Sequence, residues 1–367
     1  MKRTPLFDVH RKYGGRIIDY AGWALPVQFT GIIEEHRAVR ATAGLFDVSD
    51  MGEVEITGPG ALALVQQAVT ADVGRARSGR VVYSPMCNHR GGVVDDILIY
   101  VLGAERYLAV VNAANIEKDF NWLQELARGH SGVRVENRSD AVAQLAIQGP
   151  LAGPILYGLT RASLKELGYY RALENVEVAG TSCFLVSRTG YTGEDGFELY
   201  CRPEDAAALW EELMAAGQEE GLVPAGLGCR DTLRLEAGMP LYGQELDDER
   251  TPLEAGLDRF VAWDKGAFVG REALQRQQAG GRRLALVGLE MVDRGVPRTG
   301  YPVLAGGEQV GYVTSGSYAP SLDRHIGMAY VPPTWARAGN ELGVSIRQRA
   351  AMAKTVKLPF YRRNKEE

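Results

Sequence analysis

The chain has 367 residues, of which 46% are hydrophobic and 24% charged, and its formal net charge is −5. These values are typical of a globular protein with two or three domains. The acidic balance argues against a nucleic-acid protein that binds through a basic surface. No apolar run approaches the ~20 residues that cross a membrane, and the first residues lack the apolar segment of a secretory signal, so we expect neither.

The cysteine and histidine positions give no sign of a metal site. Cys87, Cys183, Cys201 and Cys229 are scattered, with no C-x-x-C pair among them. This spacing argues against a disulfide framework or a zinc centre and favours reduced thiols in the cytoplasm. The five histidines show no metal-ligand spacing either, so we expect no metal cofactor.

The N-terminal part of the sequence predicts short elements of both kinds. Residues 1–50 are expected to form glycine-punctuated segments and one helix, from Ile32 to Thr42, with apolar side chains at helical spacing. An alternating strand is predicted at 53–57. A helix should follow Gly58-Pro59-Gly60, where a proline near the first helical position is tolerated, and extend to about Val69.

Three strands and a helix are predicted next. The strands are expected at 80–87, 93–102 and 107–112, and the helix from about 115 to 128 with Asn115 as its candidate N-cap. Because these strands follow one another without alternating with helices, we predict an α+β fold rather than a Rossmann fold.

The same mixture continues to about residue 275. Strands are predicted at 141–147, 181–186 and 197–200, and helices at 203–216 and 230–236.

The composition changes at 279–283, and strands and turns dominate the rest of the chain. This pattern predicts a β-barrel-like C-terminal domain. The strands expected there are 284–291, 301–304, 309–314, 326–330 and 344–347.

The predicted strand at 93–102 contains two adjacent acids, Asp95 and Asp96. Because side chains alternate between the faces of a strand, the two carboxylates point in opposite directions, and Asp96 shares its face with Tyr100. Both faces are otherwise apolar. Burying an unpaired charge is costly, so at least one acid needs a donor, a cation or a ligand. A structural acid bound by backbone N–H groups is the alternative interpretation.

The glycine-rich loop at 187–196 is unusually polar for a hairpin, and Glu198 follows it between two apolar residues. On the alternation alone, Glu198 is an exposed acid on a half-buried strand. The functional alternative is a carboxylate that accepts two parallel hydrogen bonds from an amidine-like edge, such as that of a pterin or guanine.

Arg230 begins the predicted helix at 230–236. One interpretation is a surface ion pair with Asp231 or with a neighbour of Arg234. The other is a guanidinium group that binds a carbonyl or carboxylate of a ligand. The sequence contains no G-x-S-x-G and no G-x-x-x-x-G-K-[ST] motif. With these two motifs absent, the remaining hypothesis is acid and hydrogen-bond chemistry on an externally supplied cofactor.

Ordered motifs over essentially the whole chain resemble the aminomethyltransferase family, the T proteins of the glycine cleavage system. One of them is Ser187-Arg188-Thr189-Gly190-Tyr191-Thr192-Gly193-Glu194, and another is Gly92-Val93-Val94-Asp95-Asp96. The other matching segments are 4–7, 19–23, 44–49, 83–88, 111–115, 195–198, 224–228, 230–231, 241–244, 268–274, 314–316 and 359–361.

The resemblance implies a three-domain cloverleaf around a folate site. Domain 1 would comprise residues 1–50 with 138–278, domain 2 residues 51–137, and the C-terminal domain residues 279–367. It also implies the reaction. An aminomethyl group on the lipoyl arm of the H protein would pass its methylene carbon to tetrahydrofolate as co-substrate, with release of ammonia and formation of 5,10-methylenetetrahydrofolate.

The resemblance assigns roles to individual residues. Asp96 matches the catalytic acid, Glu198 the pterin-binding carboxylate, and Arg230 an arginine of the folate site. Four other positions match pocket-lining residues of the family: Tyr83, Tyr100, Asn112 and Tyr191. The aromatic faces of the three tyrosines suit a flat pterin. Tyr361 and Arg362 match a C-terminal contact near the exposed glutamate end of folate.

One position departs from the family. Asp50 stands in Asp47-Val48-Ser49-Asp50-Met51-Gly52, where the family usually has histidine. The resemblance implies that this histidine helps to receive the lipoyl arm, and in this chain an acid replaces that base.

Relatives of the same fold are the alternatives. Folate-dependent demethylases and the flavin-dependent dehydrogenases share it, but the latter carry a dinucleotide-binding domain that this chain lacks. Non-catalytic folate-binding iron–sulfur assembly factors carry a Lys-Gly-Cys motif, whereas this chain has Lys265-Gly266-Ala267.

Overall fold

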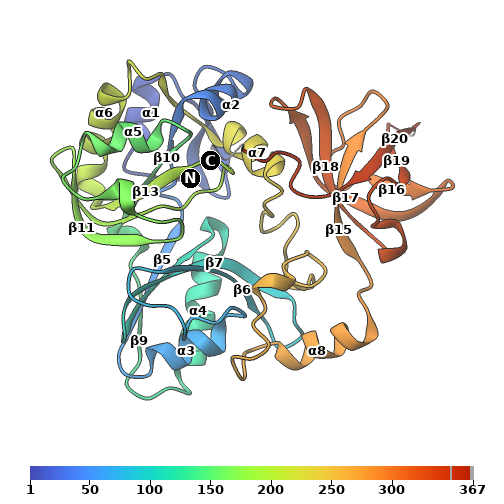
Figure 1. Cartoon of the computed structure of the whole chain (residues 1–367), viewed down its shortest axis with the longest axis horizontal. Helices are drawn as coiled ribbons and strands as arrows, with labels where there is room; N and C mark the ends of the chain where they lie inside the picture. The colour runs from blue at the N-terminus through green and yellow to red at the C-terminus, as the bar shows by residue number, and fades with distance from the viewer. Residues whose placement is uncertain (348, 364–367) are drawn as a thin grey trace. The chain divides into compact units, whose positions relative to one another are not determined.

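The computed structural model describes residues 1–347 and 349–363. Its contacts divide the chain into two compact units, Met1–Ser84 with Ile97–Arg230 and Pro85–Asp96 with Asp231–Glu367. The described strands form sheets of three, six and five strands and a closed barrel (Figure 1). Separate sheets and helices, with mostly antiparallel pairing, confirm the α+β prediction. The three-domain division stays a prediction.

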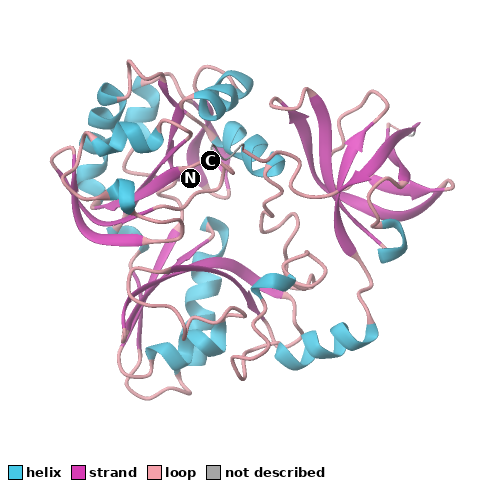
Figure 2. Cartoon of the chain, in the orientation of Figure 1, coloured by secondary structure: helices cyan, strands magenta, loops and turns pink. Residues whose placement is uncertain are grey.

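Figure 2 shows how helices and strands alternate with long connecting loops in the described chain. The helices are α1 (Phe7–Lys12), α2 (Ile32–Ala41), α3 (Ala61–Ala68), α4 (Ile116–Ala127), α5 (Ala152–Tyr157), α6 (Ala206–Ala216), α7 (Leu227–Glu236) and α8 (Arg271–Gly280).

The six-stranded sheet provides the largest core of the first unit. Its strands, in spatial order, are β11 (Ala172–Val178), β12 (Thr181–Ser187), β13 (Gly196–Cys201), β10 (Ala143–Gln148), β4 (Ala43–Asp47) and β14 (Leu222–Pro224). Helices α5 and α6 pack against this sheet, and the fully buried Trp210 of α6 lies in their shared core (Figure 1). Strand β13 lies between β12 and β10 and is buried along its whole length.

The five-stranded sheet contains the strand with the two adjacent acids. Its strands, in spatial order, are β6 (Val81–Cys87), β7 (Val93–Gly103), β8 (Arg106–Val111), β5 (Gly52–Thr57) and β9 (Arg134–Asn137). Strand β7 confirms the predicted strand at 93–102. Asp95 is fully buried, whereas Asp96 on the opposite face is half-buried. The expected buried acid is therefore Asp95.

A small N-terminal sheet was not predicted. Strands β1 (Lys2–Arg3), β3 (Trp23–Gln28) and β2 (Arg16–Tyr20) lie side by side in that order, next to the six-residue helix α1. Segments this short carry too few repeats of a periodic pattern to be recognised in a sequence.

The C-terminal strands close into a barrel, which confirms the predicted β-barrel-like domain. Its strands, in order around the barrel, are β15 (Ala285–Met291), β18 (Arg324–Val331), β17 (Glu308–Ala319), β16 (Pro302–Ala305), β19 (Glu341–Ile346) and β20 (Arg349–Val356). Val303, Val313 and Val344 lie in its apolar interior. Closure removes the free edges that would otherwise expose backbone groups.

Several element boundaries differ from the sequence predictions. Helix α7 begins at Leu227, before the predicted start at Arg230, and the residues before α6 form a 3-10 turn. Asn115 precedes α4 as expected, but its side chain makes no capping hydrogen bond. Helix α8 and strands β9, β11 and β20 were not predicted.

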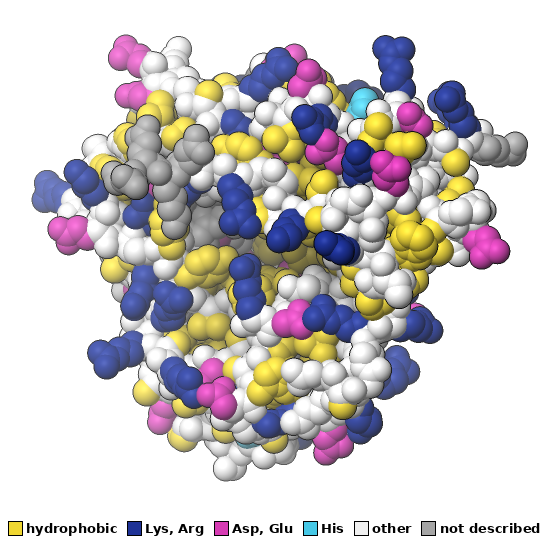
Figure 3. All heavy atoms as spheres, turned by 45° about the vertical axis from the view of Figure 1, so that its right-hand side comes forward, with side chains coloured by type: hydrophobic (Ala, Val, Ile, Leu, Met, Phe, Trp, Pro, Cys, Tyr) yellow, Lys and Arg dark blue, Asp and Glu magenta, His cyan; other side chains and the backbone are white. Residues whose placement is uncertain are grey.

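Two further observations concern the charged surface and the possibility of membrane-spanning helices. On the face shown in Figure 3, Lys and Arg side chains are interspersed with acidic and hydrophobic ones. Among residues 1–347 and 349–363, no helix is long and apolar enough to cross a membrane.

A buried ion pair fixes the end of α7 in the second unit. The Arg234 guanidinium donates to the Glu245 carboxylate at 2.9 Å and to the Ser315 hydroxyl at 2.9 Å. The side chains of Arg234 and Glu245 are 2% and 0% exposed. The hydrogen bond to Ser315 connects Arg234 of α7 to the barrel strand β17.

We expect Glu245→Ala to destabilise the protein by about 3–5 kcal/mol, because the buried Arg234 charge then loses its buried partner and keeps only the exposed Asp231 carboxylate. Asp231→Asn is the matched control, since Asp231 contacts the same guanidinium from an exposed position where an ion pair contributes little. Thermal unfolding followed by circular dichroism measures both. Equal losses in the two variants would contradict this account.

Candidate functional site

The Glu198 carboxyl lies inside the protein, although its strand alternation predicted an exposed acid. In the sheet, Glu198 pairs with Ala146 of β10 on one side and with Ser187 of β12 on the other. The residue is only 6% exposed. The exposed-acid interpretation is therefore wrong. Because β13 is covered on both faces, the carboxyl can be retained only if polar partners satisfy it.

A chain of side-chain hydroxyls supplies those partners. The Thr189 hydroxyl donates to Glu198 Oε2, and the Thr189 and Ser187 oxygens are 2.6 Å apart. The Ser187 oxygen lies 3.1 Å from the Tyr100 hydroxyl, which in turn lies 2.7 Å from the Tyr200 hydroxyl. This run from Glu198 to Tyr200 is called the hydroxyl network below.

Gln144 closes the hydroxyl network. Its side-chain amide donates to the Tyr200 hydroxyl at 3.0 Å and also hydrogen-bonds the Glu198 carboxyl. Of the network residues, the sequence identified Tyr100 and Glu198 as site residues but not Gln144, Ser187, Thr189 or Tyr200. Ser187 and Thr189 are two residues apart, as are Glu198 and Tyr200, so in an extended chain each pair lies on one face. This spacing was a weak indication that their side chains are near Glu198.

Burial raises the pKa of Glu198, and three interactions oppose that rise. They are the Thr189 hydrogen bond, the charge of Arg230 and the Gln144 hydrogen bond. Burial also raises the pKa of Tyr100, and the nearby Glu198 charge raises it further. The site thus holds a carboxylate whose charge is stabilised by a few defined donors.

Arg230 and Tyr191 lie together beside this carboxylate. The Arg230 guanidinium lies 4.8 Å from the centre of the Tyr191 ring, and its charge acts on Glu198. Arg230 is half-buried on α7, while Asp231 is exposed and pairs with Arg234. The predicted surface ion pair with Asp231 is therefore made by Arg234 rather than by Arg230.

The loop that carries Tyr191 is tied down at both ends. Arg188 donates two hydrogen bonds to Asp195, at 2.9 and 2.6 Å, and Arg40 donates to Glu194 at 2.8 Å. A side chain at Gly190 would place its Cβ 1.9 Å from the Gln148 amide oxygen. A larger residue there would have to displace the Gln148 amide, which donates to the Thr189 carbonyl at 3.0 Å and accepts from the Thr192 hydroxyl at 2.9 Å.

The other predicted residues lie in several places. Tyr83 and Asn112 are half-buried, on β6 and directly after β8. In the second unit, the Val93 N–H donates to the Asp247 carbonyl at 2.9 Å, which fixes the start of β7 before Asp96. The Tyr361 N–H donates to the Glu236 carbonyl at 2.8 Å.

Two of the predicted site residues, Tyr100 and Arg362, differ in solvent exposure. Tyr100 is fully buried and reaches Glu198 through the hydroxyl network, whereas Arg362 is exposed. The structure thus brings Glu198, Arg230, Tyr191 and Tyr100 together in the first unit. The roles of all nine predicted site residues stay predictions.

Three buried acids follow one another near this group. Asp47 Oδ2 accepts a hydrogen bond from the Thr4 hydroxyl at 2.6 Å, and His10 Nε2 lies 2.7 Å from the same carboxylate oxygen. Burial opposes ionisation of Asp47, but the contacts with His10 and Thr4 outweigh it and lower its pKa. Asp50 and Glu53 lie beyond it in the sequence and are buried as well.

Glu53 differs from Asp47 in having no hydrogen-bond partner for its carboxyl oxygens among the described residues. It is 1% exposed, and it lies opposite Val110 of β8. Burial, followed by the charge of Asp50, raises the pKa of Glu53 well above its ordinary value. The structure therefore favours a protonated, neutral Glu53.

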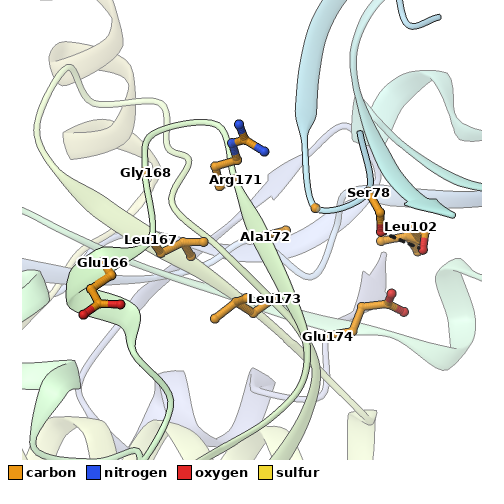
Figure 4. Close-up of a pocket in the computed structure, with 10 residues that line it drawn as sticks. Ser78, Leu102, Glu166, Leu167, Gly168, Arg171, Ala172, Leu173 and Glu174 are labelled. Carbon is orange, nitrogen blue, oxygen red and sulfur yellow. Dashed lines mark hydrogen bonds between the residues drawn. The ribbon is translucent and has the colours of Figure 1, made fainter. Parts of the chain in front are cut away.

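A surface pocket of about 490 Å³ lies elsewhere in the first unit (Figure 4). At one side the Ser78 hydroxyl donates to the Leu102 carbonyl at 3.2 Å, and Arg171 and Glu174 carry charges on its lining. None of the nine predicted site residues is among its lining residues. Among the described residues, no group of three or more His, Cys, Asp or Glu side chains could hold a metal ion.

The arrangement around Glu198 can bind a flat, polar heterocycle. A buried carboxylate presents two acceptor oxygens, a guanidinium presents a planar set of donors, and a tyrosine ring offers an aromatic surface.

Glu53→Gln should stabilise the protein at pH 8 and much less at pH 4. In wild type, the unfolded state ionises Glu53 above about pH 4.3, while the folded state retains the proton, so rising pH weakens folding. Each unit between the two pKa values corresponds to about 1.4 kcal/mol. Glutamine removes this dependence.

Unfolding midpoints of both proteins between pH 4 and pH 8 measure this effect. The control is Glu55→Gln on the same strand, because Glu55 pairs with Arg106 at 3.1 Å instead of lying unpaired in the core. A stability difference that stays constant across this pH range would show that Glu53 is ionised in the folded protein.

Comparison with known proteins accounts for this architecture. Residues 6–265 match the family model of the GCVT N-terminal domain, and residues 285–362 match the glycine cleavage T-protein C-terminal barrel domain. The chain is 57% identical over 366 residues to an aminomethyltransferase of Moorella thermoacetica, covering 100% of this chain and 99% of that protein.

Other relatives agree. An aminomethyltransferase of Halalkalibacterium halodurans is 51% identical over 363 residues, covering 99% of both chains. The crystal structure of the glycine cleavage system aminomethyltransferase T from Bartonella henselae superposes with a TM-score of 0.91 at 33% identity, covering 98% of both chains. The chain therefore belongs to the aminomethyltransferase family, the T proteins of the glycine cleavage system.

Proposed function

We propose that this chain transfers the methylene carbon of an aminomethyl group, carried on the lipoyl arm of an H protein, to tetrahydrofolate with release of ammonia. Tetrahydrofolate supplies the two nitrogens, N5 and N10, that receive the carbon. The observation that carries the proposal is the buried Glu198 carboxyl, held by Thr189 and Gln144 beside the Arg230 guanidinium. Membership of the family supports the reaction class.

The Glu198 group fits a pterin ring. A pterin presents an amidine-like edge with parallel N–H donors, and a carboxylate accepts two such bonds at once. Arg230 can donate to a ring carbonyl or to an acceptor nitrogen, and the Tyr191 ring beneath it offers an aromatic face. Because the hydroxyl network fixes the carboxyl in advance, little ordering is left for the binding step.

Asp96 is the proposed acid–base residue. It lies on β7 with its neighbour Asp95 turned to the opposite, fully buried face, and it remains half-buried. A partly accessible carboxyl can exchange protons with a reacting group, whereas a fully buried structural acid is poorly placed to do so. We propose that Asp96 positions the folate nitrogens and moves protons as the carbon is transferred.

Supporting roles are proposed for the remaining residues. Tyr83 and Asn112 would line the folate pocket, and Tyr100 would act through its hydroxyl contact rather than by direct exposure. Tyr361 and Arg362 would contact the glutamate end of folate. The exposed Arg362 is suited to a carboxylate that emerges into solvent.

The proposal includes a partner, a compartment and a domain division. The lipoylated H protein would deliver the aminomethyl group, and the reaction would take place in the cytoplasm. The four cysteines are buried and form no disulfide in the part of the chain that the structure describes, which agrees with a reducing compartment. We retain residues 1–50 with 138–278, 51–137 and 279–367 as the proposed domains.

Asp96→Asn should lower turnover by ~10²–10⁴-fold while leaving the fold intact, because the amide preserves shape but cannot accept or return a proton in the same way. The assay supplies aminomethyl-lipoyl H protein and tetrahydrofolate, and it quantifies ammonia and 5,10-methylenetetrahydrofolate. Wild-type protein should produce both in equal amounts.

Two controls make the assay decisive. The variant must retain the thermal unfolding midpoint of wild type, and its affinity for tetrahydrofolate should change little. Wild-type turnover in Asp96→Asn would refute the assigned role. Tetrahydrofolate binding by wild-type protein without either product would point instead to a demethylase or a non-catalytic folate-binding protein.

A further inference from the structure

The buried carboxylate of Glu35 connects two segments that are far apart in the sequence. Glu35 lies in α2 and is fully buried. Its Oε1 atom accepts hydrogen bonds from the backbone N–H groups of Phe29, Thr30 and Gly31, at 2.6, 3.0 and 3.2 Å. Its Oε2 atom accepts from the Gly226 N–H at 2.9 Å. One side chain therefore satisfies four backbone donors, three before α2 and one before α7.

Gly226 is the residue from which α7 begins. Its carbonyl accepts the Arg230 N–H at 3.0 Å, which makes it the cap of the first helical turn. A side chain at Gly226 would place its Cβ 2.6 Å from the backbone carbonyl oxygen of Val27 in β3. The first turn of α7 thus lies directly against the backbone near α2, with no room for a side chain between them (Figure 1).

The sheet holds the same segment just before the helix. Strand β14 pairs with β4, and the Ala225 N–H donates to the Leu45 carbonyl at 2.9 Å. The chain is therefore held by β4 at Ala225 and by Glu35 at Gly226. A shift of the first turn of α7 would break the hydrogen bond to Glu35.

Arg230 lies one turn into α7, and its side chain reaches the candidate site from there. Its guanidinium lies 4.8 Å from the centre of the Tyr191 ring, and its charge acts on Glu198. Because the direction of a side chain follows the helix backbone that carries it, the first turn of α7 decides where this guanidinium lies. Its donors form a rigid, planar fork, and hydrogen bonds weaken steeply when they are misaligned.

We propose that Glu35 is a positioning residue for the ligand site. It fixes the first turn of α7 through Gly226 and so holds the Arg230 guanidinium beside the Tyr191 ring, where it can donate to the pterin. The inference rests on the proposed binding of folate by Glu198 and Arg230. Glu35 acts through backbone contacts and is assigned no contact with the ligand.

Glu35→Gln breaks the contact with Gly226 while keeping the size of the side chain. The amide oxygen can still accept from the three N–H groups of residues 29–31, whereas the NH2 group then faces the Gly226 N–H, so that two donors oppose each other. The negative charge near the start of α7, which favours the helix, is lost as well.

The first measurement is anaerobic calorimetric titration of tetrahydrofolate into the full-length protein at pH 7.5. We expect Glu35→Gln to bind roughly three- to tenfold more weakly than wild type, as for one weakened hydrogen bond. Wild-type affinity in this variant would overturn the inference.

A double-mutant cycle separates the positioning of Arg230 from a general loss of structure. Arg230→Gln should weaken binding roughly ten- to a hundredfold, as for a lost hydrogen bond with a charged group. Because Glu35 acts through Arg230, adding Glu35→Gln to that variant should weaken binding by less than about twofold more. A loss in the double variant equal to the product of the two single losses would show that Glu35 acts elsewhere.

Turnover gives a second readout. With the aminomethyl-lipoyl H protein saturating, Glu35→Gln should raise KM for tetrahydrofolate and leave kcat within about twofold of wild type, because Arg230 is assigned to binding and not to proton transfer. A lowered kcat with an unchanged KM would contradict the inference.

Gly226→Ala perturbs the other end of the same contact and serves if Glu35→Gln does not fold. The new Cβ would meet the Val27 backbone, so the first turn of α7 must shift, while Glu35 keeps its hydrogen bonds to residues 29–31. We expect a similar three- to tenfold loss of affinity, again absent when Arg230 is already replaced. Unchanged affinity in folded Gly226→Ala would contradict the inference.

Glu254→Gln is the matched control. Glu254 is also a buried acid that accepts a backbone N–H, from Thr251 at 3.2 Å, but it belongs to the second unit. This variant should bind tetrahydrofolate as wild type does. An equal loss in Glu254→Gln would assign the effect to any lost buried carboxylate and overturn the role of Glu35.

The outcomes also distinguish this inference from the function on which it rests. Failure of wild-type protein to bind tetrahydrofolate would refute the proposed folate site itself. Equal binding by wild type and Glu35→Gln would leave the folate site in place and remove only the role of Glu35.

Discussion

The stabilisation of one buried carboxylate organises the centre of the first unit. Glu198 lies on a strand covered on both faces, so its charge depends on donors that the fold must supply. The hydroxyl network and Gln144 draw those donors from β7, β10, β12 and β13. A carboxylate supported in this way is ready to accept hydrogen bonds without rearrangement, which is the property that a pterin-binding site needs.

Buried charges elsewhere in the chain follow the same physical rule with different outcomes. Asp47 is ionised because His10 and Thr4 contact it, and Arg234 is held by Glu245. Glu53 has no hydrogen-bond partner for its carboxyl among the described residues, and it keeps its proton. Asp50 is intermediate, with burial opposed by Arg230. The supply of donors, more than burial itself, therefore decides which of these acids carry charge.

The sequence was informative where local pattern and tertiary environment agree. Strand β7 was predicted from its glycine boundaries and β-branched residues, and most barrel strands from alternation. Strand β20 was missed because its alanine-rich sequence has weak strand propensity and forms by pairing with β15 and β19. For Glu198 the sequence left two interpretations open, an exposed acid or a functional one. The alternation of Phe197, Glu198 and Leu199 does not show that both faces of β13 are covered, because that depends on the neighbouring elements. Family resemblance identified Arg230, but its contact with the Tyr191 ring depends on packing between residues distant in sequence.

The most direct test of this account is calorimetric titration of tetrahydrofolate into wild type and Glu198→Gln at pH 7.5. Glutamine keeps the size of the side chain but replaces one acceptor oxygen by a donor, so it cannot accept the paired N–H groups. The account predicts affinity lower by roughly ten- to a hundredfold with an unchanged unfolding midpoint. Equal affinity in the two proteins would contradict the claim that this buried carboxylate recognises folate.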